Sequence, residues 1–566
     1  FIIFAQTKKG MERPLHFIEH IIEEDIAAGF SKKNLRFRFP PEPNGYLHIG
    51  HVKAICLNFN LGERYSAPVY LRFDDTNPAK EEQQFVDAIK ENITWLGYEW
   101  DRECYASDYF DQLYDWAQLL ISKGLAYVDS QNSETIASQK GTPTTSGTHS
   151  PFRDRSIHEN QELFTEMKLG KHPEGAHVLR AKIDMSSPNM LLRDPVMYRI
   201  LYKTHHRTAD RWCIYPLYDW THGESDYIEQ VSHSLCSLEF KPHRDLYDWF
   251  LEALSPLEKL PPKQREFARM NLSYTVTSKR KLLELIEERI VNDWDDPRLP
   301  TIAGLRRRGY TPTSLRNFVD TAGVAKRDNI IDMSLLEFSV REDLNITAPR
   351  VMAVLDPIKL TISNYPEGKE ELLEGEINPE QLELGSRTIP FSKHLLIERE
   401  DFKEEANRKF FRLTLDKEVR LKNGYIIKGE SVVKNDLGMI TEIICSYDPD
   451  SKSGSGTEAS MRKVKGTLHW VSEAHALPAE VRLYDRLFQV EAPDQDKEVD
   501  FKTHVNPNSL SIINAFVEPS LKTAKAFENF QFQRLGYFVV DPDTTEHKLI
   551  FNKTVGLRDT WSKQNQ

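Results

Sequence analysis

The chain has 566 residues, of which 39% are hydrophobic and 28% charged, and this length predicts about four domains at roughly 150 residues each. No apolar run approaches the ~20 residues that a membrane-spanning helix needs, so the sequence predicts a soluble protein without a membrane partner. The net charge of -12 argues against a uniformly basic nucleic-acid-binding protein, but a basic stripe on one face stays open because the chain has 74 Lys and Arg residues.

Cysteine placement gives a second exclusion. The five cysteines are scattered, odd in number and never form a Cys-x-x-Cys pair: Cys56, Cys104, Cys213, Cys236 and Cys445. A disulfide framework and a structural zinc site are therefore not expected, and a reducing cytoplasm is the predicted location. No other metal-ligating residues are predicted.

The first strongly patterned region predicts a helix at 13–34, a short buried strand at 35–39 and a second helix at 52–61, with a Pro-rich turn before the second helix. A strand–loop–helix unit presents backbone N–H groups and a positive helix end to phosphates. His48 and His51 are three residues apart on the first helical turn, so both should face one spot.

Strands and helices continue to alternate, which predicts an α/β fold with a doubly wound parallel sheet. Residues 69–73 should form a second buried strand, and Asn77-Pro78 should start the next helix. Residues 105–212 are expected to be an insertion, after which 212–215 returns as a strand and 267–272 completes the sheet.

The second half of the chain changes in texture. Residues 282–348 are predicted to be helical and contain Arg306-Arg307-Arg308. Beyond Pro349, short alternating segments separated by turns with Gly and Asn predict β-barrels or a sandwich.

Two motifs resemble those of a known family. The run Pro41-Glu42-Pro43-Asn44-Gly45-Tyr46-Leu47-His48-Ile49-Gly50-His51 resembles the HIGH signature of class I aminoacyl-tRNA synthetases, and its flanks resemble the glutaminyl branch. Far downstream, Thr277-Ser278-Lys279-Arg280-Lys281 resembles the KMSKS loop, with Lys279 as its central lysine and Val276-Thr277 where the general motif has Lys-Met.

The resemblance implies a Rossmann-like doubly wound catalytic domain with an inserted acceptor-binding domain, a helical subdomain and C-terminal β-barrels. The expected division is 13–104 for the first half of the catalytic domain, 105–212 for the inserted acceptor-stem-binding domain, 213–285 for the second half of the catalytic domain, 286–348 for the helical subdomain and 349–566 for two anticodon-binding β-barrels. A monomer is implied as well.

The expected chemistry joins a carboxylate to the α-phosphate of ATP, so the protein must position the reactants and neutralise charge on the departing pyrophosphate. His48, His51 and Lys279 are expected to do this, with ATP as cofactor and Mg²⁺ held mainly by its phosphates. The residues expected to line the ATP site, mostly by resemblance, are Glu42, Pro43, Asn44, His48, Ile49, Gly50, His51, Lys53, Ser237, Arg269, Met270, Thr277, Ser278 and Lys279.

Choice of the amino acid must depend on buried polar groups, because glutamine and glutamate are nearly isosteric. Asp74, at the end of a strand, suits an α-ammonium group, and the resemblance places Tyr218 and His222 near the side-chain amide. In glutamate-specific relatives an arginine tends to stand where this chain has Cys236, and a cysteine cannot pair with a carboxylate. The expected L-glutamine site is Arg38, Asp74, Tyr218, His222, Cys236 and Gln264.

For tRNA, Arg306-Arg307-Arg308 is expected to face the inner corner of the molecule, and the β-rich half should read unstacked anticodon bases. The anticodon-contacting residues implied by the resemblance are Arg350, Arg412, Gln531 and Arg534, with Phe410 as a stacking surface. Pro143 and Pro242 replace a leucine and an acidic residue that the family commonly uses at the acceptor end, so acceptor-stem readout is expected to be looser or differently built.

Together these expectations predict that glutamine and ATP give glutaminyl-adenylate and pyrophosphate, and that the acyl group passes to the terminal ribose 2′-hydroxyl of tRNA(Gln). Two alternatives stay open: a glutamyl-tRNA synthetase or nondiscriminating enzyme, and a catalytically silent tRNA-binding paralogue. Cys236 argues against the first alternative, and intact His48, His51 and Lys279 argue against the second.

Overall fold

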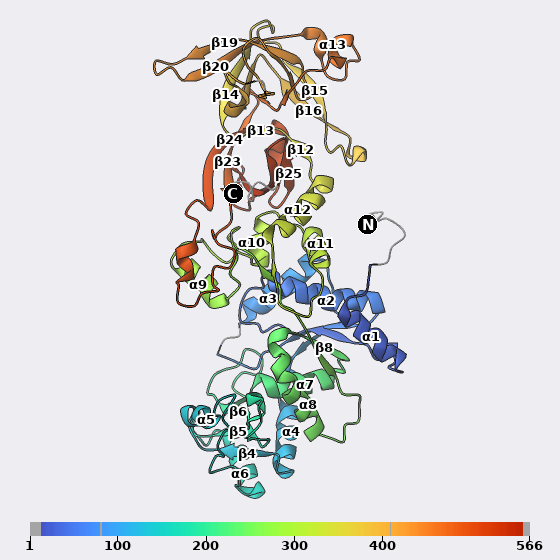
Figure 1. Ribbon diagram of the computed structural model, residues 1–566, viewed down its shortest axis with the longest axis vertical. Coiled ribbons are helices and arrows are strands. Elements are labelled where there is room, and N and C mark those ends of the chain that lie inside the picture. The colour runs from blue at the N-terminus through green and yellow to red at the C-terminus, as the bar shows by residue number, and fades with distance from the viewer. Residues whose placement is uncertain (1–12, 80–81, 408, 559–566) are drawn as a thin grey trace. The chain divides into compact units, whose positions relative to one another are not determined.

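The computed structural model describes residues 13–79, 82–407 and 409–558, and the chain divides into two units (Figure 1). The first unit comprises Phe1–Asn271 with Val319–Ile331, and the second comprises Leu272–Phe318 with Asp332–Gln566. Among the residues described, no helix combines the length and the apolar character that crossing a membrane requires.

Parallel strands organise the first unit. They are β1 (Phe37–Phe39), β2 (Val69–Phe73), β3 (Arg102–Tyr105), β8 (His233–Ser237) and β9 (Lys263–Phe267). The order β1-β2-β3 is parallel throughout, and β8 pairs in parallel with β9. Ser232, just before β8, donates its backbone N–H to the Arg36 carbonyl just before β1 over 3.0 Å, which places the two groups side by side. This confirms the predicted α/β arrangement.

Helices connect these strands. They are α1 (Phe17–Ala27), α2 (Ile49–Tyr65), α3 (Gln83–Trp95), α7 (Tyr218–Glu229) and α8 (Arg244–Ala253). The strand–loop–helix prediction is confirmed at β1 and α2, but α3 begins after Glu82 and not at Asn77-Pro78. Asn77 Oδ1 accepts a hydrogen bond from Arg199 Nη2 over 3.0 Å, so its side chain has another role.

An antiparallel sheet stands where the insertion was predicted. Its strands, in spatial order, are β4 (Ala126–Asp129), β5 (Val178–Ala181), β6 (Val196–Ile200) and β7 (Ile214–Pro216). Its helices α4 (Phe110–Ser122), α5 (Ser133–Gln139) and α6 (Ile157–Lys168) gather around it in Figure 1. The expectation that 212–215 returns to the parallel sheet is wrong, because β7 pairs antiparallel with β6. The last parallel strand is β9, earlier than the predicted 267–272.

The second unit begins with helices and ends in β-structure, as predicted. Its helices include α9 (Lys279–Glu287), α10 (Ile302–Arg307), α12 (Met333–Thr347) and α13 (Glu458–Met461), and α11 (Pro312–Ala322) spans the boundary between the units. Two short strands, β10 (Asn271–Leu272) and β11 (Ile330–Ile331), also lie at this boundary.

Two seven-stranded, barrel-like sheets make up the C-terminal part. The first C-terminal sheet has the order β12 (Arg350–Val351), β25 (Asn529–Phe532), β26 (Gly536–Val540), β27 (Leu549–Gly556), β23 (Leu477–Tyr484), β24 (Leu510–Val517) and β13 (Ala353–Val354). The second has the order β21 (Thr467–Leu468), β18 (Glu418–Leu421), β19 (Ile426–Lys434), β20 (Ile440–Tyr447), β14 (Pro357–Ile362), β17 (His394–Glu398) and β22 (Val471–Ser472). The hairpin of β15 (Glu371–Glu376) and β16 (Ser386–Phe391) packs on the core of the second sheet.

Candidate functional site

The two histidines of the first motif cap the start of α2 reciprocally. His48 Nδ1 accepts a hydrogen bond from the Gly50 N–H, and His51 Nδ1 accepts one from the His48 N–H, each over 3.1 Å. The ring centroids are 4.0 Å apart, which confirms that the two rings lie together. Because each Nδ1 accepts, each Nε2 carries the ring proton as a hydrogen-bond donor.

Burial keeps both rings uncharged. It lowers the pKa of His51 to about 4 and holds the pKa of His48 well below its ordinary value. The motif therefore offers a phosphate neutral hydrogen bonds, and positive charge must come from other residues.

Several of the residues predicted to line an ATP site surround this motif. A Cβ atom on Gly50 would lie 2.8 Å from His48 Cε1 and 3.7 Å from Met270 O, so a side chain does not fit there. Asn44 donates its side-chain amide to the Glu42 carboxylate within the preceding loop, and the Pro43 carbonyl accepts from the Glu82 N–H over 3.1 Å.

Glu239 brings two further predicted residues together. Its two carboxylate oxygens accept hydrogen bonds from Ser237 Oγ over 2.7 Å and from Arg269 Nη1 over 3.0 Å. Ile49 and Lys53 are buried on α2, at 0% and 1% exposure. Their contact with a ligand stays a prediction.

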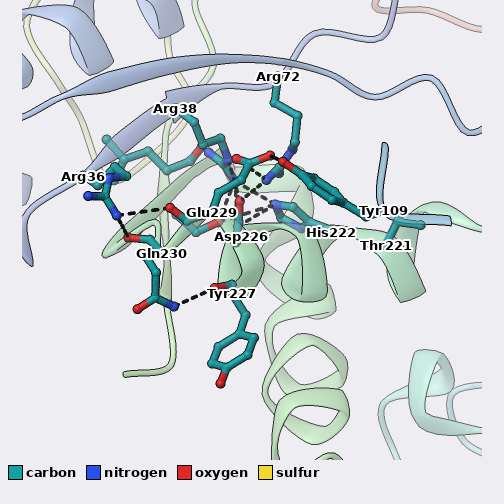
Figure 2. Close-up of polar contacts among 12 residues, drawn as sticks. Arg36, Arg38, Arg72, Tyr109, Thr221, His222, Asp226, Tyr227, Glu229 and Gln230 are labelled. Atoms are coloured by element: carbon teal, nitrogen blue, oxygen red, sulfur yellow. Dashed lines mark hydrogen bonds and ion pairs between the residues drawn. The ribbon is translucent and has the colours of Figure 1, made fainter. Parts of the chain in front are cut away.

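A chain of hydrogen bonds connects Arg38 through His222 to Tyr218, and we call it the neutral relay because the His222 ring is uncharged. Arg38 is fully buried, and its Nε and Nη2 donate to Asp226 Oδ1 and Oδ2 over 3.0 and 3.2 Å (Figure 2). Its Nη2 also donates to His222 Nε2 over 2.7 Å, so the ring proton is on Nδ1, 3.3 Å from the Tyr218 hydroxyl. Burial lowers the pKa of His222 to about 3. With His222 donating, the hydroxyl proton of Tyr218 remains for a ligand.

Beneath this relay lies an ion cluster that sequence reasoning missed. Arg72 Nη1 contacts Asp226 Oδ1 at 2.7 Å and Glu229 Oε2 at 3.1 Å, and Tyr109 donates to Glu229 over 3.1 Å (Figure 2). The charges of Arg38 and Arg72 are therefore balanced by two carboxylates on α7. An arginine within the apolar strand 69–73 was the available signal.

Two buried oxygens nearby have no hydrogen-bond partner among the described residues. They are Asp74 Oδ1 and Gln264 Oε1, although Gln264 Nε2 donates to Phe240 O over 2.9 Å. Burial, reinforced by the charge of Glu42, raises the pKa of Asp74 to about 7. A buried carboxylate oxygen that still lacks a donor, such as Asp74 Oδ1, is suited to an ammonium group.

Cys236 lies in the middle of the predicted amino-acid site. Its Sγ is 3.8 Å from Arg38 Nη2 and 3.7 Å from His222 Nε2. Burial, with Cys236 and Asp74 nearby, raises the pKa of Tyr218 far above its ordinary value. The structure thus gathers all the predicted residues of this site except Gln264 around one cluster, and Gln264 lies on the adjacent β9.

The lysine loop belongs to the second unit. Val276 is buried in an apolar cluster with Leu282 and Leu285, and Ser278 immediately precedes α9. Lys279 starts this helix and is exposed, as are Ser278 and Arg280. The Lys-Met of the general motif is therefore replaced here by a core residue and the half-buried Thr277.

The predicted anticodon residues form two groups in the second unit. Arg350 and Gln531 are partners on neighbouring strands β12 and β25, and Arg350 Nη2 donates to Asn345 O over 2.8 Å. Arg412 and Arg534 line one hollow of about 580 Å³. The other residues around this hollow are Glu400, Lys403, Lys409, Phe410, Phe411 and Thr467.

The side chains of Arg306, Arg307 and Arg308 contact other parts of the second unit. Arg307 pairs with Asp541 and Asp543 at 3.0 and 2.7 Å, and Arg308 Nη2 donates to Tyr484 O over 3.1 Å. The Arg306 guanidinium lies 4.8 Å from the Phe527 ring centre. Arg307 and Arg308 therefore hold the helical part to the first C-terminal sheet, and the expectation that the three arginines face tRNA stays a prediction.

The structure shows how Pro143 and Pro242, the two prolines predicted to change acceptor-stem readout, are held. Pro143 is exposed in a turn whose flanking carbonyls of Thr142 and Thr145 both accept from Arg193 Nη1 over 2.9 Å. The Pro242 carbonyl accepts from Asn189 Nδ2 over 2.8 Å. Both segments are thus fixed through backbone carbonyls.

One cluster has the composition of a metal site, namely Asp75, His205 and His206. His205 Nδ1 accepts N–H groups of Arg207 and Thr208 over 3.1 and 3.2 Å, and its Nε2 is 2.7 Å from Asp75 O. Because both ring nitrogens of His205 are engaged, this cluster does not fit a divalent cation.

Comparison with known proteins identifies the family. The model for the catalytic domain of tRNA synthetases class I (E and Q) matches residues 34–346, and models for their anti-codon binding domains match residues 348–448 and 467–541. A solved glutamate tRNA ligase from Elizabethkingia meningosepticum has a TM-score of 0.42 and 18% identity, over 56% of this chain and 70% of its own.

Curated relatives match over nearly the full length. The glutamine–tRNA ligase of Rhodopirellula baltica is 56% identical over 549 residues, covering 97% of this chain and 90% of the relative. Those of Nitrosomonas europaea and Salmonella paratyphi B are 55% and 54% identical, covering 97% and 98% of this chain and 99% of each relative. The chain therefore belongs to the class I tRNA synthetases of the E and Q group, which are aminoacyl-tRNA ligases.

Proposed function

We propose that the chain acts as a glutamine–tRNA ligase. L-glutamine and ATP give glutaminyl-adenylate and pyrophosphate, and the glutaminyl group then passes to the 3′-terminal ribose 2′-hydroxyl of tRNA(Gln) with release of AMP. Relatives of that name at 53–56% identity support this choice. From the structure, the observation that carries it is the neutral relay from Arg38 through His222 to Tyr218.

The relay favours an amide over a carboxylate. The charge of Arg38 is paired with Asp226 and His222 is neutral, so within the described part of this cluster no unpaired cation is available to a substrate carboxylate. The Tyr218 hydroxyl donates to the amide oxygen of glutamine, and Gln264 Oε1 is an acceptor suited to the amide N–H. The Asp74 carboxylate takes the α-ammonium group.

The chemistry of activation needs little beyond orientation and charge neutralisation. A glutamine carboxylate oxygen attacks the α-phosphorus, and the bond to pyrophosphate breaks. His48 and His51 donate Nε2 hydrogen bonds to ATP phosphates, and Lys279 supplies positive charge to the departing pyrophosphate. When ATP binds, Mg²⁺ would be held mainly by its phosphates and would offset part of their negative charge.

The remaining assignments are part of the same proposal. The catalytic domain comprises 13–104 and 213–285, and the inserted acceptor-stem-binding domain comprises 105–212, extended through β7. The helical subdomain is 286–348, and the two anticodon-binding β-barrels are 349–566. Arg350, Arg412, Gln531 and Arg534 contact the anticodon loop, where splayed bases are read by edge hydrogen bonds and stacking. We further propose a cytoplasmic monomer.

The test is aminoacylation of total tRNA with labelled glutamine and labelled glutamate in parallel. We expect charging with glutamine alone, loss of charging in Lys279→Ala, and unchanged charging in Lys522→Ala, an exposed lysine of the same unit. Charging with glutamate alone would replace the proposal by a glutamyl enzyme, and charging with both by a nondiscriminating one. Binding of tRNA without any charging would identify a silent paralogue.

A further inference from the structure

A buried carboxylate lies beneath the hollow that Arg412 and Arg534 line. Asp401 ends the 3-10 turn η6 (Arg399–Asp401) and is 0% exposed. Its Oδ2 and Oδ1 accept hydrogen bonds from Arg534 Nη1 and Nη2 over 2.5 and 2.7 Å. Its Oδ1 is also 3.3 Å from Arg412 Nε. One carboxylate thus holds both arginines of the hollow.

The two arginines come from different sheets. Arg534 lies in the turn between β25 and β26 of the first C-terminal sheet, with a φ of 69° that residues other than glycine seldom adopt. Arg412 is held beside the second C-terminal sheet, where the neighbouring Leu413 N–H donates to Asp401 O over 3.0 Å. Asp401 therefore fixes one arginine to the other across the two sheets.

The contacts leave a defined part of each guanidinium for a ligand. Arg534 gives both Nη groups to Asp401, and Nη1 also meets His469 Nδ1 at 3.1 Å. Its Nε–H and one Nη2–H form the remaining two-donor edge. Arg412 Nη1 donates to the Glu400 carboxylate over 2.9 Å, which leaves Nη2. Within the described chain no contact occupies these donors, and both side chains are about a third exposed, at 31% and 36%.

His469 and Glu398 further hold the Arg534 side chain in place. His469 is buried and its Nε2 lies 3.4 Å from Glu398 Oε1. The Glu398 oxygens accept the N–H groups of Leu355 and Asp356 over 2.7 and 3.0 Å, where the chain passes from β13 to β14. The arginine pair is thus anchored at the crossing between the two sheets.

We propose that Asp401 is a positioning residue for tRNA recognition, which presents Arg412 and Arg534 in one orientation to the phosphate or base-edge acceptors of an unpaired nucleotide. Guanidinium donors match such acceptors in a fixed planar geometry, so their orientation decides the affinity. Without the carboxylate, two cations would repel each other and each would have to be ordered on binding. This inference rests on the proposed function, because only that function assigns the hollow to tRNA.

The chain supplies a matched control in Glu518. This carboxylate is also buried, also spans the two C-terminal cores, and accepts from Arg387 Nε and Nη2 over 2.7 and 3.1 Å. Arg387 does not line the hollow. Glu518→Gln therefore removes an equivalent ion pair without disturbing the arginine pair.

The experiment compares wild type, Asp401→Asn, Asp401→Glu and Glu518→Gln, with folding checked by circular dichroism at 10 °C. Dissociation constants are measured for a tRNA(Gln) transcript and for one with a substituted anticodon base, and KM and kcat in charging. We expect Asp401→Asn to raise the dissociation constant and the KM for tRNA about tenfold and to reduce discrimination between the transcripts. The KM for ATP and glutamine and the kcat at saturating tRNA should change less than about twofold.

Asp401→Glu keeps the charge but shifts it by one methylene, and should weaken tRNA binding by a smaller factor. If Asp401→Asn does not fold, the tRNA dissociation constant of Asp401→Glu tests the inference instead. The inference is overturned if the Asp401 variants bind tRNA as wild type does, or if Glu518→Gln weakens binding equally. Failure of wild type to charge glutamine would count against the proposed function, while the binding comparison would still decide the role of Asp401.

Discussion

Two buried aspartates, one in each unit, each hold a pair of arginines. Asp226 contacts Arg38 and Arg72 at 3.0 and 2.7 Å, and Asp401 contacts Arg412 and Arg534 at 3.3 and 2.5 Å. The carboxylates are equally inaccessible, but the arginines differ. Those of Asp226 are 0% and 2% exposed, whereas those of Asp401 are 36% and 31% exposed.

We call the buried cluster around Asp226 the floor and the partly exposed cluster around Asp401 the edge. Around Asp226, a second carboxylate, Glu229, balances the second arginine, so the charges cancel inside the protein. Around Asp401 the hollow retains an excess of cations, because Lys403 and Lys409 also line it. The same kind of ion pair is therefore buried and charge-balanced in one unit, whereas in the other it lies at a hollow that retains positive charge.

The strongest way to test the comparison is Asp226→Asn. Removing the Asp226 carboxylate takes from the buried Arg38 its ion-pair partner and leaves Arg72 with Glu229 alone, so we expect a loss of about 3–5 kcal/mol in unfolding free energy, measured in urea. Asp401→Asn should cost clearly less, because solvent reaches both of its arginines. Equal losses in the two variants would remove the distinction between floor and edge.

Asp74 offers a third buried aspartate for the comparison, and its Oδ1 has no hydrogen-bond partner among the residues that the structure describes. We expect Asp74→Asn to lower kcat/KM for glutamine about 100-fold, through loss of a charge-assisted hydrogen bond to the α-ammonium group. The KM for tRNA should stay within about twofold. A normal kcat/KM for glutamine in this variant would show that another group binds the ammonium.

The same residue predicts a pH dependence. Burial raises the pKa of Asp74 to about 7, so below that pH the carboxyl group is protonated in the free enzyme. The wild-type kcat/KM for glutamine should therefore fall about tenfold per pH unit below 7. Asp74→Asn should lack this limb. His51 and His222, with pKa values of about 4 and 3, do not titrate in this window.

These residues also show what the sequence could reveal. The strand, turn and α2 around His48 follow from local periodicity and turn chemistry, and β2 was predicted with its exact bounds. The ion cluster around Arg72 was not predicted, because Arg72 and Glu229 are 157 residues apart in the sequence and Glu229 looks like part of a polar helix face. Asp401 was missed for the same reason: its partner Arg534 is 133 residues away.

Pairing partners were the other limit. The apolar run 212–215 correctly predicted a strand, but such a run does not tell which strand lies beside it, and β7 joined the inserted sheet. The Asn77-Pro78 pair had the right chemistry for a helix start. The Asn77 side chain instead meets Arg199, a contact that no local pattern encodes.

On the edge side of the comparison, Arg412→Ala should weaken tRNA binding about tenfold at low salt. It should also reduce the slope of log affinity against log salt by about 1, as expected for one lost phosphate contact. Arg462→Ala is the control, because Arg462 lies in the same unit with 41% exposure and pairs with Glu418 and Asp448 away from the hollow. An unchanged salt slope in Arg412→Ala would instead indicate contact with a base.

The smallest effect concerns a carboxylate with no arginine at all. Glu224 lies on α7, two residues before Asp226, is 0% exposed, and both of its oxygens lack a hydrogen-bond partner within the described part of the chain. Burial raises the pKa of Glu224 well above its ordinary value, whereas Arg38 and Arg72 hold the pKa of Asp226 far below its own. One helix thus carries two buried carboxyl groups whose pKa values are shifted in opposite directions.

The sign of the resulting pH effect follows from proton linkage. Between the unfolded pKa near 4.5 and the raised folded pKa, the native state holds a proton that the unfolded chain releases, so stability falls as pH rises, by at most about 1.4 kcal/mol per pH unit. Glu224→Gln does not titrate and should flatten the profile by that slope, measured by urea unfolding from pH 5 to 8. Glu252→Gln, an exposed change on α8, should leave the slope unaltered. If Glu224→Gln keeps the wild-type slope, then Glu224 is ionised in the folded protein and is paired with a cation. Glu224 and Asp226 would then both be ionised, and the contrast between them would be lost.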